Sequence, residues 1–202
     1  MSRLFKSSLV LIALAASVPA FAGGNGFEST IKGPVTTAID IEVSLSEDMA
    51  HRANNLPEKL SDRGSSSRMR DGFANNGYYG DKDLEQLIER LESKLEASFA
   101  KEGLQVLDGA PVTLNVVLVD AKPNRPTFNQ MSKSSSLSMQ SFANGGAEIT
   151  GEIIVSDGAE MGTLSYKYYE NDIENAQYGG TWSDAHKAIS RYASKTAKAL
   201  SN

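Results

Sequence analysis

Basic and aromatic side chains are interleaved between residues 63 and 79, where Arg63, Arg68 and Arg70 are followed by Tyr78 and Tyr79. A guanidinium group binds carboxylate or phosphate through parallel hydrogen bonds, and an aromatic ring offers a face for stacking. This combination is typical of a loop that binds an anion or a glycan. The same composition is also typical of a flexible insertion whose aromatic rings pack against the domain.

A second set of basic residues, Lys187, Arg191 and Lys195, recurs at intervals of four in the C-terminal segment. On a helix this spacing places the three cations in one row, which can contact an anionic lipid or a protein partner. The alternative is a solvated helix face, whose cations in the last turns also interact favourably with the helix dipole.

His51 and His186 are the only histidines and therefore the candidates for acid–base catalysis. A hydrolase would use one of them together with nearby carboxylates. The chain has no G-x-S-x-G motif for a serine nucleophile, no H-E-x-x-H motif for zinc, and no cysteine. We predict no catalytic residue and keep the hydrolase as an alternative.

Metal and nucleotide sites are not predicted either. Asp81, Asp83 and Glu85 are close in sequence, but a calcium loop needs oxygen ligands spread over about twelve residues around a glycine. The glycines of "FANGGAEITGEI" match neither the phosphate-binding loop nor the dinucleotide fingerprint, and they precede a strand instead of a helix. We expect no cofactor and no metal.

The N-terminus has the pattern of a secretory signal peptide over residues 1–22. Arg3 and Lys6 precede an uncharged run at 9–16, and Ala20-Phe21-Ala22 forms a small-x-small cleavage signal. A membrane span needs about 20 apolar residues, roughly twice this run. We expect cleavage after Ala22, no transmembrane segment in the mature chain, and a periplasmic location.

Cleavage would remove two of the 20 basic and none of the 25 acidic residues, which leaves a formal charge of −7. An acidic chain is unsuited to sequence-independent nucleic-acid binding, because that binding depends on lysine and arginine neutralising phosphates. We therefore expect no nucleic-acid partner.

Alternation and helical periodicity predict the elements that must position these residues. We expect a disordered lead-in at 23–34, a strand at 36–45, a long loop at 47–80, a helix from 81 to about 102, a strand over "PVTLNVVLVDA", a hairpin from 148 to 168, and a helix from 181. The serine-rich segment after "KPNRPT" is an exposed loop or an irregular edge strand. Asp81 or Asp83 is expected to cap the first helix, and Thr181 with Asp184 the last.

These elements predict an α+β fold for a single domain at 35–202. The expected architecture is a two-layer sandwich, a mixed or antiparallel sheet of about four strands with two amphipathic helices on one face. We expect a non-enzymatic protein that binds an envelope component or a protein partner through the 47–80 loop. A structural module that self-associates through a sheet edge, and hence a homo-oligomer, is a further alternative.

The leader, "VDAKPNRPT", "NGGAEITGEI" and "TWSDAHKAISRYASKTAKAL" together resemble uncharacterised envelope-associated α/β domain proteins of bacteria, many of them lipoproteins. The resemblance covers roughly the second half of the mature chain, and its motifs are structural. It implies a fold and an envelope location. The chain departs from the lipoproteins because it has no cysteine to carry a lipid.

Overall fold

The computed structural model describes residues 25–63 and 72–202. Its strands are β1 (Gly26–Ser29), β2 (Ile39–Leu45), β3 (Val112–Lys122), β4 (Gly146–Val155) and β5 (Glu160–Tyr169). Its helices are α1 (Glu47–Arg52), η1 (Leu60–Asp62), α2 (Gly72–Asn75), α3 (Asp81–Lys101), α4 (Phe128–Lys133), α5 (Ile173–Ala176) and α6 (Ser183–Ser201). The fold is α+β, as the sequence predicts.

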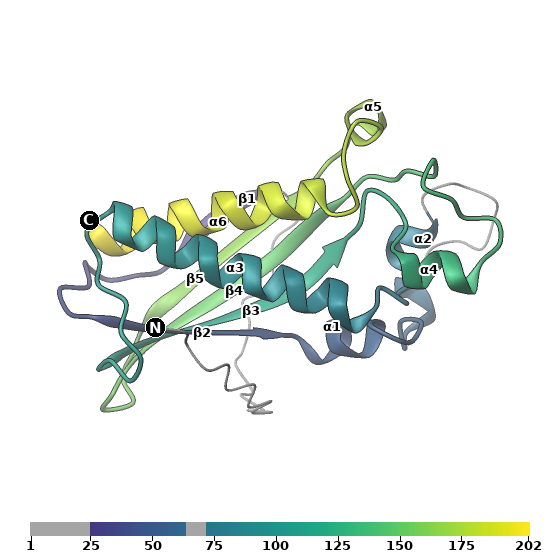
Figure 1. Ribbon diagram of the computed structural model, residues 1–202. Helices are drawn as coiled ribbons and strands as arrows, with labels where there is room; N and C mark the ends of the chain where they lie inside the picture. Colours follow the sequence, from purple (N-terminus) through teal and green to yellow (C-terminus); the bar gives the residue numbers. More distant parts are fainter. Residues whose placement is uncertain (1–24, 64–71) are drawn as a thin grey trace, which may run out of the picture.

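The strands form one mixed sheet in the order β1-β5-β4-β3-β2 (Figure 1). The β2 and β3 strands are parallel, with Val43 opposite Val116, whereas the other pairs are antiparallel. Between Leu118 and Asp120 the pairing of β3 with β4 shifts register. A bulge of this kind turns the end of a strand, and here it precedes the polar residues of the candidate site.

The two long helices, α3 and α6, lie side by side on one face of this sheet (Figure 1). They run in the same direction, because the start of α3 meets the start of α6: the indole nitrogen of Trp182 donates to Asp83 at 2.8 Å. Their apolar stripes face the strands, as the spacing of apolar residues at intervals of three and four predicts.

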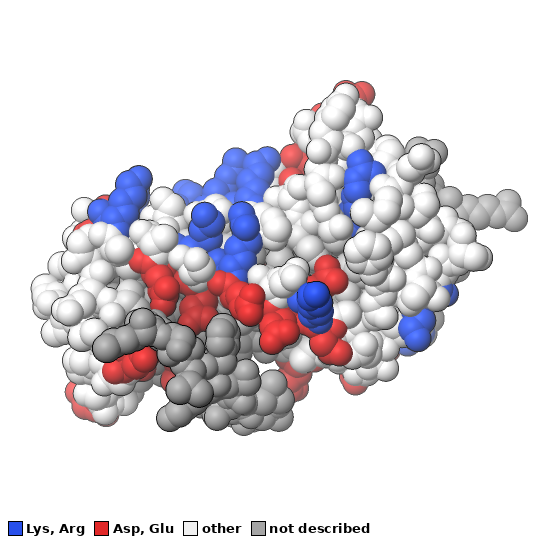
Figure 2. Space-filling view, viewed as in Figure 1, with Lys and Arg blue, Asp and Glu red and all other residues white. Residues whose placement is uncertain are grey.

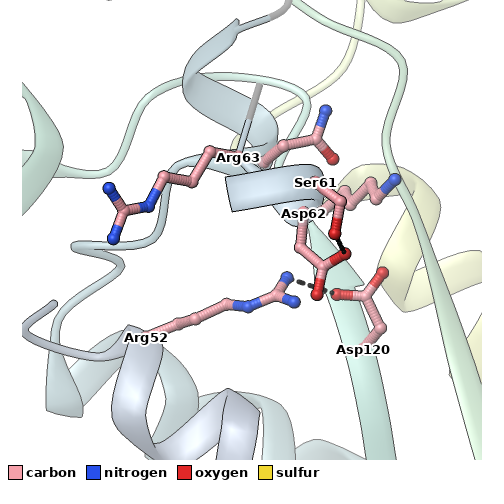
Figure 3. A pocket seen from close by; sticks show the side chains of 7 residues that line it. Arg52, Ser61, Asp62, Arg63 and Asp120 are labelled. Carbon is pink, nitrogen blue, oxygen red and sulfur yellow. Dashed lines mark hydrogen bonds and ion pairs between the residues drawn. The ribbon is translucent and has the colours of Figure 1, made fainter. Parts of the chain in front are cut away.

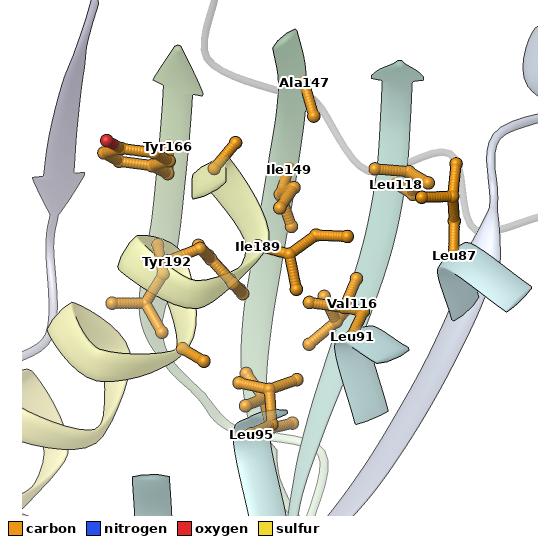
Figure 4. Close-up of a cluster of buried hydrophobic side chains, with 14 of the residues drawn as sticks. Leu87, Leu91, Leu95, Val116, Leu118, Ala147, Ile149, Tyr166, Ile189 and Tyr192 are labelled. Carbon is orange, nitrogen blue, oxygen red and sulfur yellow. The ribbon is translucent and has the colours of Figure 1, made fainter. Parts of the chain in front are cut away.

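The core lies between this helix layer and the sheet (Figure 4). Its central members come from both helices and the inner strands: Leu87, Leu91, Leu95, Ile189 and Tyr192 above, and Val116, Leu118, Ile149 and Tyr166 below. The buried aliphatic side chains provide most of the driving force for folding, about 1.5–3 kcal/mol for each one removed from water.

The predicted disordered lead-in is wrong at residues 26–29, which form the edge strand β1. Phe27 pairs with Tyr166, and the Asn25 side chain bonds the backbone of Tyr169 in both directions at 2.8 and 2.9 Å. The sheet therefore has five strands where about four were expected. Glycine-rich composition concealed a strand whose partner is distant in sequence.

The predicted loop at 47–80 is also wrong in part, because α1, η1 and α2 occupy 47–52, 60–62 and 72–75. Ser46 caps α1 by accepting from the backbone of Met49. In the serine-rich segment, α4 begins with a capping box between Thr127 and Gln130. Gln130 also donates to the carbonyls of Phe73 and Gly77, so α4 ties this segment to the region of α2.

The expected caps of the long helices are wrong. Gly80 precedes α3 and Trp182 precedes α6, and neither helix has a side-chain cap hydrogen bond. Asp81 instead accepts from Asn54, and Asp184 accepts from Asn124. These two carboxylates therefore accept hydrogen bonds from residues distant in sequence and do not cap the helices as the local pattern predicts. Across the described ranges, no helix has the length and apolarity needed to cross a membrane.

Candidate functional site

A polar pocket of about 380 Å³ lies where α1 and η1 meet the end of β3 (Figure 3). We call it the Arg52 pocket; it is lined by Arg52, Ser61, Asp62, Arg63, Asn75, Asp120 and Lys122. The register shift in β3 comes directly before Asp120. The pocket thus joins the segment after β2 to the end of β3.

Arg52 forms the inner wall of this pocket and is only 8% exposed. Its guanidinium pairs with Asp48 one helical turn earlier and with Asp120 at 3.1 Å. Burial lowers the pKa of Arg52, but Asp120, Tyr79 and Asp48 outweigh that effect, so the net pKa is raised. Arg52 is therefore a fixed cation whose charge is already neutralised.

Both oxygens of Asp120 are occupied. Oδ1 accepts from Arg52, and Oδ2 accepts from the Tyr169 hydroxyl at 2.5 Å. Burial, and then the charge of Asp120, raise the pKa of Tyr169 far above its ordinary value. Tyr169 therefore stays protonated and serves as a hydrogen-bond donor to the carboxylate.

Lys122 and Arg63 are the remaining cations of the pocket. The ammonium of Lys122 lies 4.8 Å from the centre of the Tyr169 ring, a cation–π distance. Arg63 donates through Nε to the carbonyl of Pro57 at 2.8 Å. Among residues 25–63 and 72–202, neither cation forms an ion pair with a carboxylate.

Of the interleaved residues predicted from sequence, Arg63 lines the pocket, whereas Arg68 and Arg70 lie outside the described residues. The prediction that Tyr79 binds a partner is wrong, because its side chain is fully buried and its hydroxyl donates to the carbonyl of Ala74. Tyr78 is half-buried, and Lys133 lies 5.7 Å from its ring.

The predicted cations of the last helix do lie in one row, over β5 and β1. The Lys187 ammonium donates to the Tyr168 hydroxyl at 2.6 Å and lies 3.7 Å from Glu170. Arg191 stacks on the same Tyr168 ring at 4.9 Å, and Lys195 lies 5.6 Å from the ring of Phe27. The cation row lies on α6, which contributes no residue to the lining of the Arg52 pocket. The predicted binding residues therefore belong to two separate surfaces.

The two histidines do not line the Arg52 pocket. The imidazole of His51 is 4.0 Å from the exposed Glu58 carboxylate. His186 is half-buried, and burial together with the positive charge of Arg90 lowers its pKa to about 4. Within the described part of the chain it has no carboxylate within ion-pair distance, the group that orients the imidazole in a Ser-His-Asp triad.

Sequence reasoning missed Arg52, Asp120 and Lys122. A weak signal exists for two of them: Asp120 and Lys122 alternate at the end of the "VTLNVVLVDAK" strand, where an inward apolar pattern gives way to charges. Arg52 stands four residues after Asp48, which reads as an ordinary helix ion pair. Only the fold shows that this pair meets Asp120, 68 residues later.

The lining of the pocket offers charged groups, hydrogen-bond donors and acceptors to a ligand. Ser61 donates a hydrogen bond to Asp62 at 3.0 Å, and no histidine is among the residues that line the pocket. Within the described residues, no group of three or more histidine or acidic side chains is arranged to hold a metal ion. Two cations without carboxylate partners remain as the groups available to a ligand.

No protein-family model matches the sequence, and no curated protein matches it. Three solved structures match this chain over most of its length. A PelC dodecamer from Paraburkholderia phytofirmans has 13% sequence identity, with 85% of this chain and 95% of that chain covered and a TM-score of 0.44. A Xanthomonas campestris protein of the DUF330 family has 9% identity, coverage of 82% and 83%, and a TM-score of 0.41. A minor lipoprotein from Acinetobacter baumannii has 11% identity, coverage of 83% and 92%, and a TM-score of 0.36.

Proposed function

We propose that this protein is exported to the bacterial periplasm and binds a small anionic component of the envelope in the Arg52 pocket, without catalysing a reaction. The leader at 1–22 supports the export. The binding role is inferred from which of the three cations in the pocket form ion pairs with carboxylates. Arg52 is neutralised by two carboxylates, whereas Arg63 and Lys122 have none in the described part of the chain.

The geometry favours a ligand with a carboxylate or phosphate group. Arg63 offers a planar donor fork and Lys122 a compact ammonium, and each of these cations suits a carboxylate or phosphate group. Asp120 accepts hydrogen bonds from Arg52 and Tyr169 and forms no ion pair with Lys122 within the described residues. Ser61, Asp62 and Asn75 complete the lining with further polar groups.

The first experiment measures binding of inorganic phosphate and of succinate to the mature chain, residues 23–202, by following backbone amide chemical shifts. We expect shifts at Arg52, Arg63 and Lys122, and a loss of at least tenfold in affinity in Arg63→Ser and in Lys122→Ser. Lys82→Ser, which removes an exposed cation of α3, is the matched control and leaves the affinity unchanged. Equal binding by all four proteins would exclude the pocket.

A second experiment tests the envelope as the source of the ligand. The triple variant Arg63→Ser, Arg68→Ser, Arg70→Ser is compared with the native sequence for retention on solubilised envelope fractions. We expect retention to fall in the triple variant and to persist in Lys82→Ser. If the triple variant is retained as well as the native sequence, these three arginines do not mediate the association with the envelope. The mass of the mature protein checks the leader, since cleavage after Ala22 leaves an N-terminus at Gly23.

A further inference from the structure

The outer face of the helix layer carries opposite charges on its two sides. In Figure 2 acidic side chains form a row along one side of this layer, and basic side chains gather along the other. The acidic row consists of Glu85, Glu89, Glu92 and Glu96 on α3, and the basic row of Lys187, Arg191, Lys195 and Lys198 on α6.

The acidic row lies on the side of α3 that faces away from α6. Asp83 bonds to Trp182 and Arg90 lies near His186, so these two residues mark the side of α3 that faces α6. At 100° per residue, the buried leucine stripe lies between the four glutamates and the side of α3 that carries Asp83 and Arg90. That side lies above β2, the edge strand next to β3.

The basic row lies on the opposite outer side of the molecule. Its contacts with Tyr168 and Phe27 place Lys187, Arg191 and Lys195 beside β5 and β1, away from α3. β1 is the other edge strand of the sheet. Each edge of the molecule therefore has a strand and a helix row, and the two rows have opposite charge.

The two rows also match in length and direction. Each has four charges between positions 85 and 96 or between 187 and 198, so each is about 16 Å long at 1.5 Å per residue. Since α3 and α6 run in the same direction, the rows are parallel. A second copy placed beside the first, in nearly the same orientation, brings four cations along four carboxylates.

Within one chain, each row places like charges close together on its helix. Like charges at intervals of four destabilise a helix by about 0.2–0.5 kcal/mol for each pair, and both rows contain such pairs. Within the described residues Glu85, Glu89 and Glu96 form no ion pair, and in the basic row only Lys187 has one, with Glu170 at 3.7 Å. A partner of opposite charge would relieve this repulsion on both helices at once.

We propose that the protein self-associates head to tail, with the α6 basic row of one copy against the α3 acidic row of the next. The interface is heterologous, so it produces a closed ring or a filament instead of a two-fold dimer. A second copy fits better than an anionic membrane, because the mature chain has a net negative charge and carries the complementary acidic row itself.

Charge-reversal variants test this interface by sedimentation velocity of the mature chain. One variant has Arg191→Glu, Lys195→Glu and Lys198→Glu; the other has Glu85→Lys, Glu89→Lys and Glu96→Lys. We expect the native protein to associate at low salt and to dissociate as NaCl rises from about 50 to 500 mM, since the contacts are exposed to screening. Each variant alone should associate at least tenfold more weakly, because both of its rows then carry the same sign.

An equimolar mixture of the two variants is the decisive sample. The reversed α6 of the first variant faces the reversed α3 of the second, and the native rows of both also complement each other. We expect the mixture to recover association as complexes that contain both chains in equal amounts. Circular dichroism of each variant establishes that it is folded. A monomeric native protein at about 100 µM and low salt, or a mixture that remains monomeric, would overturn the proposal. Binding of the monomeric native protein to anionic vesicles through the α6 row would overturn it in favour of a membrane.

Discussion

The hydroxyl oxygen of Tyr192 lies directly above Gly151, where a Cβ atom would sit only 2.3 Å from it. Tyr192 belongs to α6 and is fully buried, and Gly151 lies in the middle of β4 opposite Val116. Glycine in a strand interior marks a close approach of another group. The glycine in "EITGEI" thus makes room for the tyrosine that fixes α6 on the sheet.

We predict that Gly151→Ala lowers the free energy of unfolding by about 1–3 kcal/mol, as overpacking of a filled core does. The added methyl group would meet both the rigid tyrosine and the Cδ1 of Leu114 at 3.2 Å. Urea denaturation measures the loss. Removing the hydroxyl in Gly151→Ala with Tyr192→Phe should recover most of it; an alanine variant as stable as the native protein would contradict the close contact.

Asn124 is expected to be a stabilising residue of the connection after β3. Its amide donates to Asp184 at 2.5 Å, and its carbonyl oxygen accepts from the Asp184 backbone at 2.9 Å. Asn124→Ala leaves the buried carboxylate of Asp184 without this donor, so we expect a loss of about 2–4 kcal/mol in unfolding free energy. The exposed Asn171→Ala is the control and should stay within about 0.5 kcal/mol of the native protein. Similar stability of both variants would show that the bond contributes little.

His186 should make the protein less stable in mild acid. Burial and Arg90 lower its folded-state pKa to about 4, from an ordinary value of 6.5. As the pH falls below 6.5 the unfolded chain binds a proton that the folded chain does not, so stability declines down to about pH 4. Because the ring is partly exposed, we expect a loss of about 1 kcal/mol and not the full value of the shift.

Urea denaturation at pH 7 and pH 4.5 measures the effect of His186. In His186→Gln this part of the pH dependence should disappear, and in Arg90→Gln it should shrink. Direct titration of the imidazole by NMR, with His51→Gln for assignment, gives the pKa itself. A titration midpoint at 6.5 or above would contradict the buried position of the ring.

Breaking the Arg52–Asp120 ion pair is expected to lower the free energy of unfolding. Arg52→Met removes the cation from a carboxylate that is 18% exposed, and we expect a loss of about 3 kcal/mol in unfolding free energy. Asp120→Asn tests the other partner, and a double-mutant cycle should give a coupling of about 1–3 kcal/mol. Additive effects of the two substitutions would show that the ion pair has no coupling of its own.

The long amphipathic elements were predictable from the sequence because their pattern is local. Leu84, Leu87, Leu91 and Leu95 repeat at helical spacing within one helix, and the alternation of Val112, Leu114 and Val116 lies within one strand. Gly103, which follows the helix-spaced run, adopts the left-handed conformation that often ends a helix, with φ of 80°. Each of these features needs no information from the rest of the chain.

The features that were missed depend on partners distant in sequence. The four residues of β1 are too few to show a period, and their strand exists because β5 offers a free edge. Asp83 and Asp184 resemble caps, but Trp182 and Asn124 bind them from elsewhere in the chain. The Arg52 pocket likewise joins residues from separate segments, so Arg63 was predicted while its neighbours Asp120 and Lys122 were not.

The pairing of β1 with β5 has a consequence for the order in which the protein folds. Asn25 and Tyr169, which bond at this edge, are 144 residues apart. Any process that delivers the chain from its N-terminus presents the first strand long before its partner strand has emerged. The edge therefore closes among the last long-range contacts, and loop-closure entropy makes such contacts slow to form. Under the proposed export, this late closure would leave the first strand unpaired until nearly all of the chain has been delivered across the membrane.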